Sequence, residues 1–182
     1  AERSVLNSSE HNQLPVYIAT AQPLDSEMKQ RIMRHQQLRN EQSWQLIECP
    51  VALHQLLPRM SGEQKVLVDC MTLWLSNQLT LGLETAQCQS QDIDKLTGEQ
   101  SAKLDCFLHQ QVGELGTALG QVTADITLVS NEIGLGVVPV GQATRLFVDH
   151  QGWMNQKLAQ LADKVTLVTA GIPLTIKETA YG

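Results

Sequence analysis

The sequence predicts an α/β protein built on a mostly parallel sheet with helices on both faces. Short apolar runs typical of strands alternate along the chain with longer segments that repeat apolar residues at helical spacing. The run Lys65–Asp69 is continuously apolar up to its aspartate, as in a strand covered on both faces. Strands and helices in alternation favour parallel pairing through crossover helices, which brings the strand ends to one rim.

The composition is that of an ordinary globular protein. A chain of 182 residues suits one domain over residues 1–182 and can bury a core without disulfides. The net charge of -6 and the absence of a long apolar run argue against a nucleic-acid partner and against membrane insertion. The four cysteines lack metal-type spacing, so we expect free thiols in a reducing cytoplasm.

The first half of the chain is predicted to hold three strands. A helix is expected to open at Asp25, whose side chain can cap it, with Glu27 in its first turn. Pro50 suits the first turn of another helix, and a third begins directly after Asp69. The strands are residues 15–20, 44–48 and 65–69, and the helices are residues 1–6, about 25–39, 50–57 and from about 70.

The second half continues the alternation. Residues 82–99 are polar and glutamine-rich, and are predicted to form a surface loop without a catalytic role. Two glycines and a proline mark an ordered loop over residues 131–139. The remaining elements are helices over about 100–119 and 141–162, strands over 124–130 and 164–169, a turn at 171–173 and an edge strand over 174–177.

Polar side chains end several of the predicted strands. They are Thr20, Glu48, Asp69 and the pair Asn131 and Glu132. Because α/β sheets bind ligands at the carboxyl ends of their strands, we expect these residues to share a site. An aspartate at the position of Asp69 often holds Mg²⁺ in nucleotide-binding sheets, although it could equally cap the following helix.

The helix from Asp25 carries a stripe that turns from apolar to polar. Such a stripe marks either a helix that runs out of the core into a site or a helix end that meets water, and the residues alone leave both open. Its members are Leu24, Met28, Ile32, His35 and Arg39.

A series of short motifs covers nearly the whole chain. In order they are Tyr17-Ile18-Ala19-Thr20-Ala21, Asp25-x-Glu27-Met28-x-x-Arg31-Ile32-x-Arg34-His35, residues 67–77, residues 130–139, residues 152–159 and residues 170–174. Each motif is weak alone, but their order is specific. The chain resembles the bifunctional adenosylcobinamide kinase / adenosylcobinamide-phosphate guanylyltransferase family of cobalamin assembly.

The resemblance implies a P-loop NTPase fold of the RecA-like type. In that family a strand and the loop Gly-Gly-x-Arg-Ser-Gly-Lys-Ser precede the residues that match Ala1-Glu2, and this sequence does not contain them. We therefore expect the chain to be a fragment, or a native chain that has lost its first segment, without the N-terminal strand and P-loop and with little kinase activity as it stands.

The resemblance also implies two reactions. Adenosylcobinamide would be phosphorylated by ATP or GTP, and GMP would then pass from GTP to adenosylcobinamide phosphate, which gives adenosylcobinamide-GDP. His35 matches the histidine that carries GMP in the family, and a largely neutral imidazole can attack the α-phosphorus. Asp69 would hold Mg²⁺.

Further site residues follow from the same resemblance. Arg39 would neutralise phosphate charge, Glu48 would accept hydrogen bonds from guanine, and Asn131 and Glu132 would face the substrate. The other histidines match no motif and are expected at the surface: His11, His54, His109 and His150. The nucleotide contacts would be Ala19, Thr20, Ala21, Gln36, Gln37, Leu38, Arg39, Glu48 and Asp69.

Two other functions are compatible with parts of the pattern. A different P-loop small-molecule kinase would use Asp69 but not His35, and a non-catalytic nucleotide-binding or assembly module would need neither. The resemblance also implies a homo-oligomer, with a trimer as one candidate form and a site shared between subunits.

Overall fold

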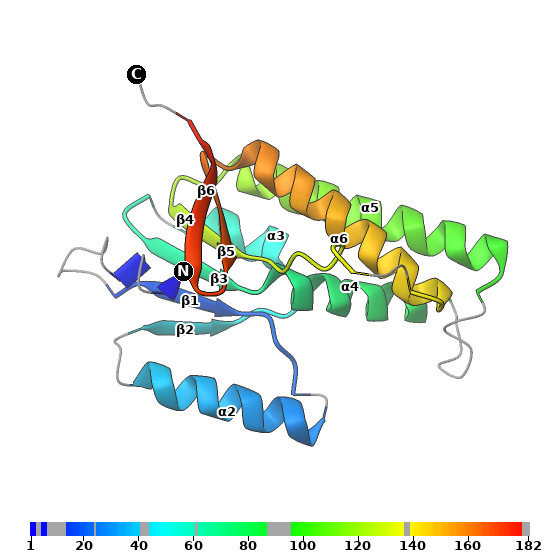
Figure 1. The fold of residues 1–182 in the computed structure, drawn as a ribbon, viewed down its shortest axis with the longest axis horizontal. Coiled ribbons are helices and arrows are strands. Elements are labelled where there is room, and N and C mark those ends of the chain that lie inside the picture. Colours follow the sequence, from blue (N-terminus) through cyan, green and yellow to red (C-terminus); the bar gives the residue numbers. More distant parts are fainter. Residues whose placement is uncertain are drawn as a thin grey trace.

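The computed structural model describes residues 1–2, 5–6, 14–23, 25–40, 44–60, 62–86, 96–136 and 139–179, with the backbone alone for residues 35–40. Strands and helices alternate as predicted (Figure 1). The elements are β1 (Val16–Ala19), α2 (Ser26–Asn40), β2 (Gln45–Glu48), α3 (Leu53–Leu56), the 3-10 turn η1 (Leu57–Arg59), β3 (Lys65–Asp69), α4 (Met71–Thr85), α5 (Gly98–Leu119), β4 (Asp125–Val129), α6 (Gln142–Leu161), β5 (Lys164–Thr169) and β6 (Ile172–Glu178).

Four strands form one parallel sheet in the order β2-β1-β3-β4. The register pairs Ala19 of β1 with Glu48 of β2 on one side and with Asp69 of β3 on the other. Asp69 in turn pairs with Val129 of β4. The strands therefore end level with one another, which confirms the predicted α/β class and the shared carboxyl rim.

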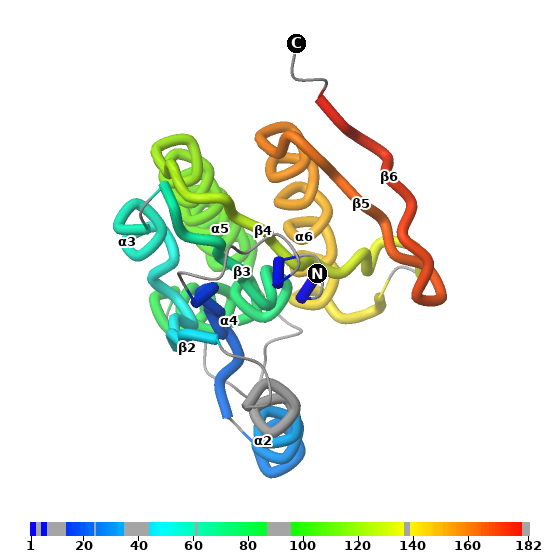
Figure 2. The backbone as a smooth tube through the Cα atoms, turned by 90° about the vertical axis from the view of Figure 1, so that its left-hand side faces the viewer, coloured from blue at the N-terminus to red at the C-terminus, as the bar shows by residue number. Residues whose placement is uncertain are grey.

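Helices α3 to α6 pack on one face of this sheet. Alternate strand residues such as Ile18 and Val68 are fully buried there, against Trp74 of α4, Leu104 of α5 and Met154 of α6. The helix predicted after Asp69 is thus a buried one. Figure 2 shows α5 and α6 side by side, with α2 at the opposite end of the molecule.

The other face of the central strands carries a smaller apolar cluster. Tyr17 and Leu67 point to this face because side chains alternate along a strand. They pack with Val5, Trp44 and Val129, and the rings of Tyr17 and Trp44 meet edge to face at 5.7 Å. Both faces of β1 and β3 are therefore covered, as the continuous apolar run of β3 predicts.

Helix α2 is weakly packed by comparison. The side chain of Asp25 accepts a hydrogen bond from the backbone N–H of Met28 at 2.7 Å, which confirms the predicted start. Of the side chains described on α2, Met28 and Ile32 are partly buried and the others are exposed. Both belong to the predicted stripe. The described side chains of α2, over residues 26–34, therefore bury little surface in the core.

Helix α4 runs beyond the point where a surface loop was predicted to begin. Gly82 and Leu83 are buried in the helix, and a Cβ added at Gly82 would lie 2.5 Å from Leu104 Cδ1. The glycine thus permits a close approach of α4 and α5 that the sequence pattern did not reveal. The rest of that predicted loop falls mostly at 87–95, outside the described residues.

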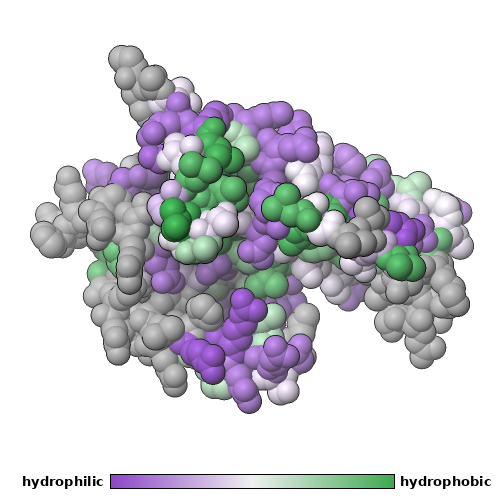
Figure 3. All heavy atoms as spheres, viewed as in Figure 1, coloured by the Kyte–Doolittle hydropathy of each residue, from purple (hydrophilic) through white to green (hydrophobic). Residues whose placement is uncertain are grey.

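The predicted edge strand is confirmed as β6, which pairs antiparallel with β5. Its turn lies at Ala170 and Gly171, one residue earlier than predicted, and both adopt positive φ angles of 51° and 78°. Within the described chain, this hairpin forms a sheet separate from the four parallel strands. Exposed apolar residues lie on the surface of this hairpin, where Figure 3 shows hydrophobic atoms. They are Val168, Ile172, Leu174 and Ile176, each 60% to 70% exposed; Ile172 and Leu174 alternate onto one face of the hairpin, and Val168, which pairs with Pro173, lies on the other.

The predicted surface position of the other histidines and the predicted absence of membrane-spanning segments can be compared with the structure. His150 was predicted at the surface and is only 3% exposed, because it lies between α5 and α6, so that prediction is wrong. His109 is exposed, His54 is partly exposed, and His11 lies outside the described residues. None of the described helices is long and apolar enough to cross a bilayer.

Candidate functional site

The carboxylate of Asp69 stands at the centre of the rim. It accepts a hydrogen bond from the Tyr17 hydroxyl of the neighbouring strand. The N-cap position of α4 belongs to Cys70, which makes no side-chain cap, so the alternative role of Asp69 as helix cap does not hold. Among the described residues, the second carboxylate oxygen of Asp69 has no hydrogen-bond partner and remains available to a ligand.

Thr20 locks the end of β1 to the end of β3. Its hydroxyl donates to the Cys70 carbonyl at 2.7 Å and accepts from the Cys70 N–H at 2.8 Å, and the Thr20 N–H donates to the Asp69 carbonyl at 3.2 Å. Thr20 is fully buried. Its hydroxyl is therefore occupied within the protein and serves to hold the two strand ends together.

Asn77 of α4 joins the segment that follows β2 to the end of β1. Its side-chain amide donates to the Thr20 carbonyl at 2.8 Å and to the Pro50 carbonyl at 2.9 Å. On the same side, the Cys49 N–H donates to the Ala19 carbonyl at 2.9 Å. The segments that follow β1, β2 and β3 are thus held together by buried hydrogen bonds.

Glu48 ends the edge strand β2 and points its side chain into solvent. Within the described part of the chain, its carboxylate has no hydrogen-bond partner. Ala19 and Ala21 flank Thr20 beside it and are partly buried. The β2 side of the rim therefore offers a free acceptor next to small residues that leave room for a ligand.

The loop after β4 is held at the same rim by α6 and α4. Asn155 donates from its side-chain amide to Glu132 Oε1 at 2.7 Å and to the Asn131 carbonyl at 3.1 Å. The Asn131 N–H donates to Thr72 Oγ1 at 3.0 Å, and Gln151 donates to Ser130 Oγ at 2.9 Å. Asn131 is thereby held beside the first turn of α4, and Glu132 is held by Asn155 of α6.

Several residues of this rim were not singled out as site residues from the sequence. Tyr17 and Asn155 lie inside motifs that support the family resemblance, which is the signal that could have found them. Gln151 is fully buried on α6, but a glutamine in a helix reads equally well as a surface residue. These side chains hold the polar groups of the rim in place.

The predicted residues on α2 are only partly located. His35, Gln36, Gln37, Leu38 and Arg39 lie on the helix backbone, and their side chains are outside what the structure describes. Burial raises the pKa of the Cys70 thiol, Asp69 raises it further, and Arg31 opposes this shift. Arg31, one turn before His35 on α2, is the smallest of these influences on the Cys70 pKa.

Comparison with known proteins decides the family. The family described as cobinamide kinase / cobinamide phosphate guanyltransferase matches residues 1–176. The chain belongs to this family. It is accordingly a transferase of cobalamin synthesis that uses nucleoside triphosphates, as the ordered motifs indicated.

Three bacterial relatives support the assignment. The bifunctional adenosylcobalamin biosynthesis protein CobP of Pseudomonas aeruginosa is 41% identical over 163 residues, which cover 88% of this chain and 81% of the relative. The bifunctional adenosylcobalamin biosynthesis proteins CobU of Salmonella typhimurium and Escherichia coli are each 34% identical, over 89% of this chain and 85% of theirs.

Replacing Thr20 tests whether its hydroxyl holds the rim together. Thr20→Val keeps the shape but leaves the N–H and carbonyl of Cys70 without their partner, so we expect a loss of about 1–3 kcal/mol in the free energy of unfolding. Thr20→Ser keeps the hydroxyl and should lose less. Urea denaturation of both variants gives the comparison, and equal stabilities for the two would contradict this role.

Proposed function

We propose that this family member carries out both reactions at the carboxyl rim of its sheet, with GMP carried on His35. Adenosylcobinamide is phosphorylated first, and GMP from GTP then passes to adenosylcobinamide phosphate. The observation that supports this most is the level register of Glu48, Ala19 and Asp69 across three neighbouring strands. It puts two carboxylates with free oxygens at one edge, separated by small residues.

Asp69 is the residue we assign to Mg²⁺. The Tyr17 hydroxyl fixes one carboxylate oxygen, and the other has no partner in the described chain. Carboxylate and phosphate oxygens are the ligands that Mg²⁺ prefers. When bound, the ion would neutralise charge on the triphosphate. The buried hydroxyl group of Tyr17 would keep the Asp69 carboxylate oriented toward the ion.

Glu48 is the residue we assign to the guanine base. It stands two strands away from Asp69, about 10 Å by ordinary strand spacing, a separation suited to the base and phosphates of one nucleotide. An exposed carboxylate can accept hydrogen bonds from the two N–H groups on the edge of guanine. Adenine presents no such pair of donors, so this contact would favour GTP in the guanylyl step.

His35 is the residue we assign as nucleophile. The imidazole nitrogen attacks the α-phosphorus of GTP, an N–P bond forms, and the bond to pyrophosphate breaks. A phosphate oxygen of the substrate then attacks the same phosphorus and releases the imidazole. Support comes from the family match, because His35 stands in the motif that also contains Arg31 and Arg34.

The remaining assignments complete the proposal. Ala19, Ala21 and the backbone of Thr20 would lie against the nucleotide, Gln36, Gln37, Leu38 and Arg39 would approach its phosphates, and Asn131 and Glu132 would face the corrinoid. We also propose a homo-oligomer that works in the cytoplasm without nucleic acid. In such an assembly, α2 of one subunit would supply His35 to the carboxyl rim of another subunit.

Replacing His35 tests the covalent step. In the protein expressed from its complete gene, α-labelled GTP should leave label on the chain that is stable to alkali and lost in acid. His35→Ala should abolish the label and reduce GMP transfer at least about 10³-fold, because the nucleophile is gone. His54→Ala is the matched control and should label normally. Undiminished labelling of His35→Ala would exclude this residue as the carrier.

Replacing Asp69 tests the metal assignment. In the protein expressed from its complete gene, Asp69→Asn should lower kinase turnover at least about tenfold and raise the Mg²⁺ concentration needed for half-maximal rate. Asp125→Asn is the control, since Asp125 lies at the amino end of β4 and pairs with Lys65 at 2.6 Å. Kinase assays over a Mg²⁺ series measure both effects. An unchanged Mg²⁺ dependence in Asp69→Asn would show that another group holds the ion.

A further inference from the structure

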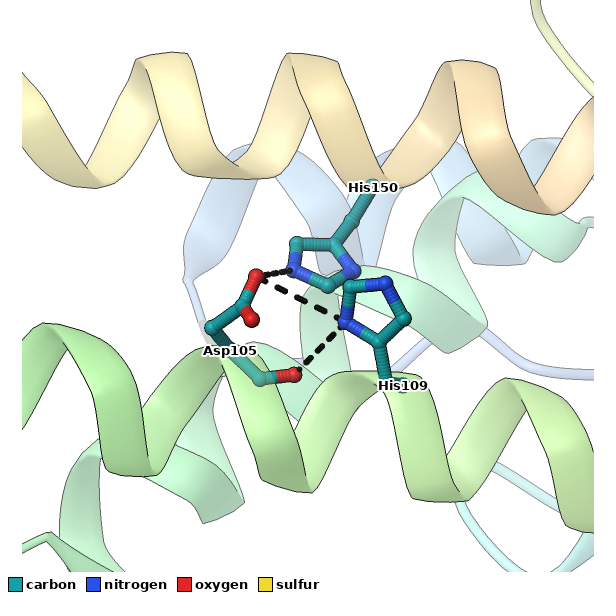
Figure 4. A group of neighbouring side chains, drawn as sticks. All are labelled: Asp105, His109 and His150. Carbon is teal, nitrogen blue, oxygen red and sulfur yellow. Dashed lines mark hydrogen bonds and ion pairs between the residues drawn. The ribbon is translucent and has the colours of Figure 1, made fainter.

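Three side chains with metal-binding atoms meet between α5 and α6 (Figure 4). Asp105 and His109 lie one turn apart on α5, and His150 reaches them from α6. Asp105 Oδ1 is 3.0 Å from His150 Nε2 and 3.5 Å from His109 Nδ1. The three atoms all lie within 4.8 Å of one another. None of these residues belongs to the carboxyl rim, so the nucleotide chemistry leaves the group without a role.

The surrounding helices hold the two imidazoles in this arrangement. His150 is only 3% exposed, and the ring of His109 lies 4.7 Å from it and 4.3 Å from the ring of Trp153 on α6. The buried ring of His150 loses most of its freedom on folding, and the half-exposed His109 is held by these ring contacts and by the hydrogen bond between its Nδ1 and the Asp105 backbone carbonyl at 3.0 Å. His150 Nε2 and Asp105 Oδ1 therefore already face each other, and an ion would take His109 Nδ1 from that carbonyl.

We propose that Asp105, His109 and His150 bind a divalent transition-metal ion of the zinc type. Tetrahedral zinc with bonds of about 2.0–2.1 Å requires about 3.3–3.4 Å between its ligand atoms. The two distances to Asp105 Oδ1 bracket this value. Two imidazoles and one carboxylate favour zinc and its neighbours in the first transition row over Mg²⁺ or Ca²⁺, which prefer oxygen alone.

The exposure of the three residues suits an ion that enters from solvent. The side chains of Asp105 and His109 are 51% and 47% exposed, whereas the side chain of His150 is 3% exposed. Water can therefore reach the site and fill the fourth position. The ion would replace the contacts that Asp105 makes with the two rings, and it would join α5 to α6 by bonds from both helices.

A purely structural role for the same residues makes a different prediction. Asp105 could simply pair with the buried His150, in which case the protein would have no particular affinity for zinc. The test is a titration of the chelator-treated, nucleotide-free protein with Zn²⁺ against a chromophoric competitor. We expect one ion per chain and a melting temperature that rises with Zn²⁺, since the ion binds the folded state.

Variants at the exposed positions keep the test independent of folding. His109→Gln and Asp105→Asn should each weaken Zn²⁺ binding at least about tenfold and abolish the rise in melting temperature. His54→Gln removes a histidine near α5 that lies outside the group, and it should bind as the unaltered protein does. With Co²⁺ in place of Zn²⁺, the spectrum should show nitrogen and oxygen ligands only.

Three results would overturn the proposal. One is the absence of stoichiometric binding, and another is binding that His109→Gln and Asp105→Asn leave unchanged. The third is a cobalt–thiolate absorption band, which would point instead to a cysteine such as the exposed Cys106. Because the readouts are affinity, melting temperature and spectrum, they are independent of whether the proposed nucleotide chemistry is correct.

Discussion

The register of β1 between β2 and β3 is the constraint on which the rest of the site depends. It sets Ala19, Glu48 and Asp69 level at one edge, and the Thr20 hydroxyl then holds both backbone groups of Cys70. Because a shift of one residue would turn every side chain to the opposite face, the buried cores on both faces protect this register. The rim is thus rigid because the strands beneath it are packed on both sides.

Rigidity at the rim contrasts with the loose packing of α2. The sheet ends are fixed by buried polar contacts such as those of Asn77, whereas the described side chains of α2 are mostly exposed. A helix that makes few core contacts can change position at small energetic cost. That property would suit the proposed role of His35, which must receive GMP from GTP and deliver it to a second substrate.

Much of the fold could be predicted from the sequence, because strand runs and helical stripes depend on local periodicity. The polar rim residues could be found for the same reason, since each follows a strand directly. Residues such as Gln151 and His150 could not, because a polar side chain in a helix is buried only if distant segments provide partners. The continuation of α4 through Gly82 likewise depends on the contact with Leu104, which no local pattern records.

The most direct test of the rim is backbone hydrogen exchange with and without GTP and Mg²⁺, in the protein expressed from its complete gene. The account predicts that the nucleotide slows exchange in peptides that contain Thr20, Cys49 and Cys70, because it covers the carboxyl ends of β1, β2 and β3. Peptides at the amino ends of the same strands should exchange as before. Slowed exchange at the amino ends, or none at the rim, would contradict the placement of the nucleotide.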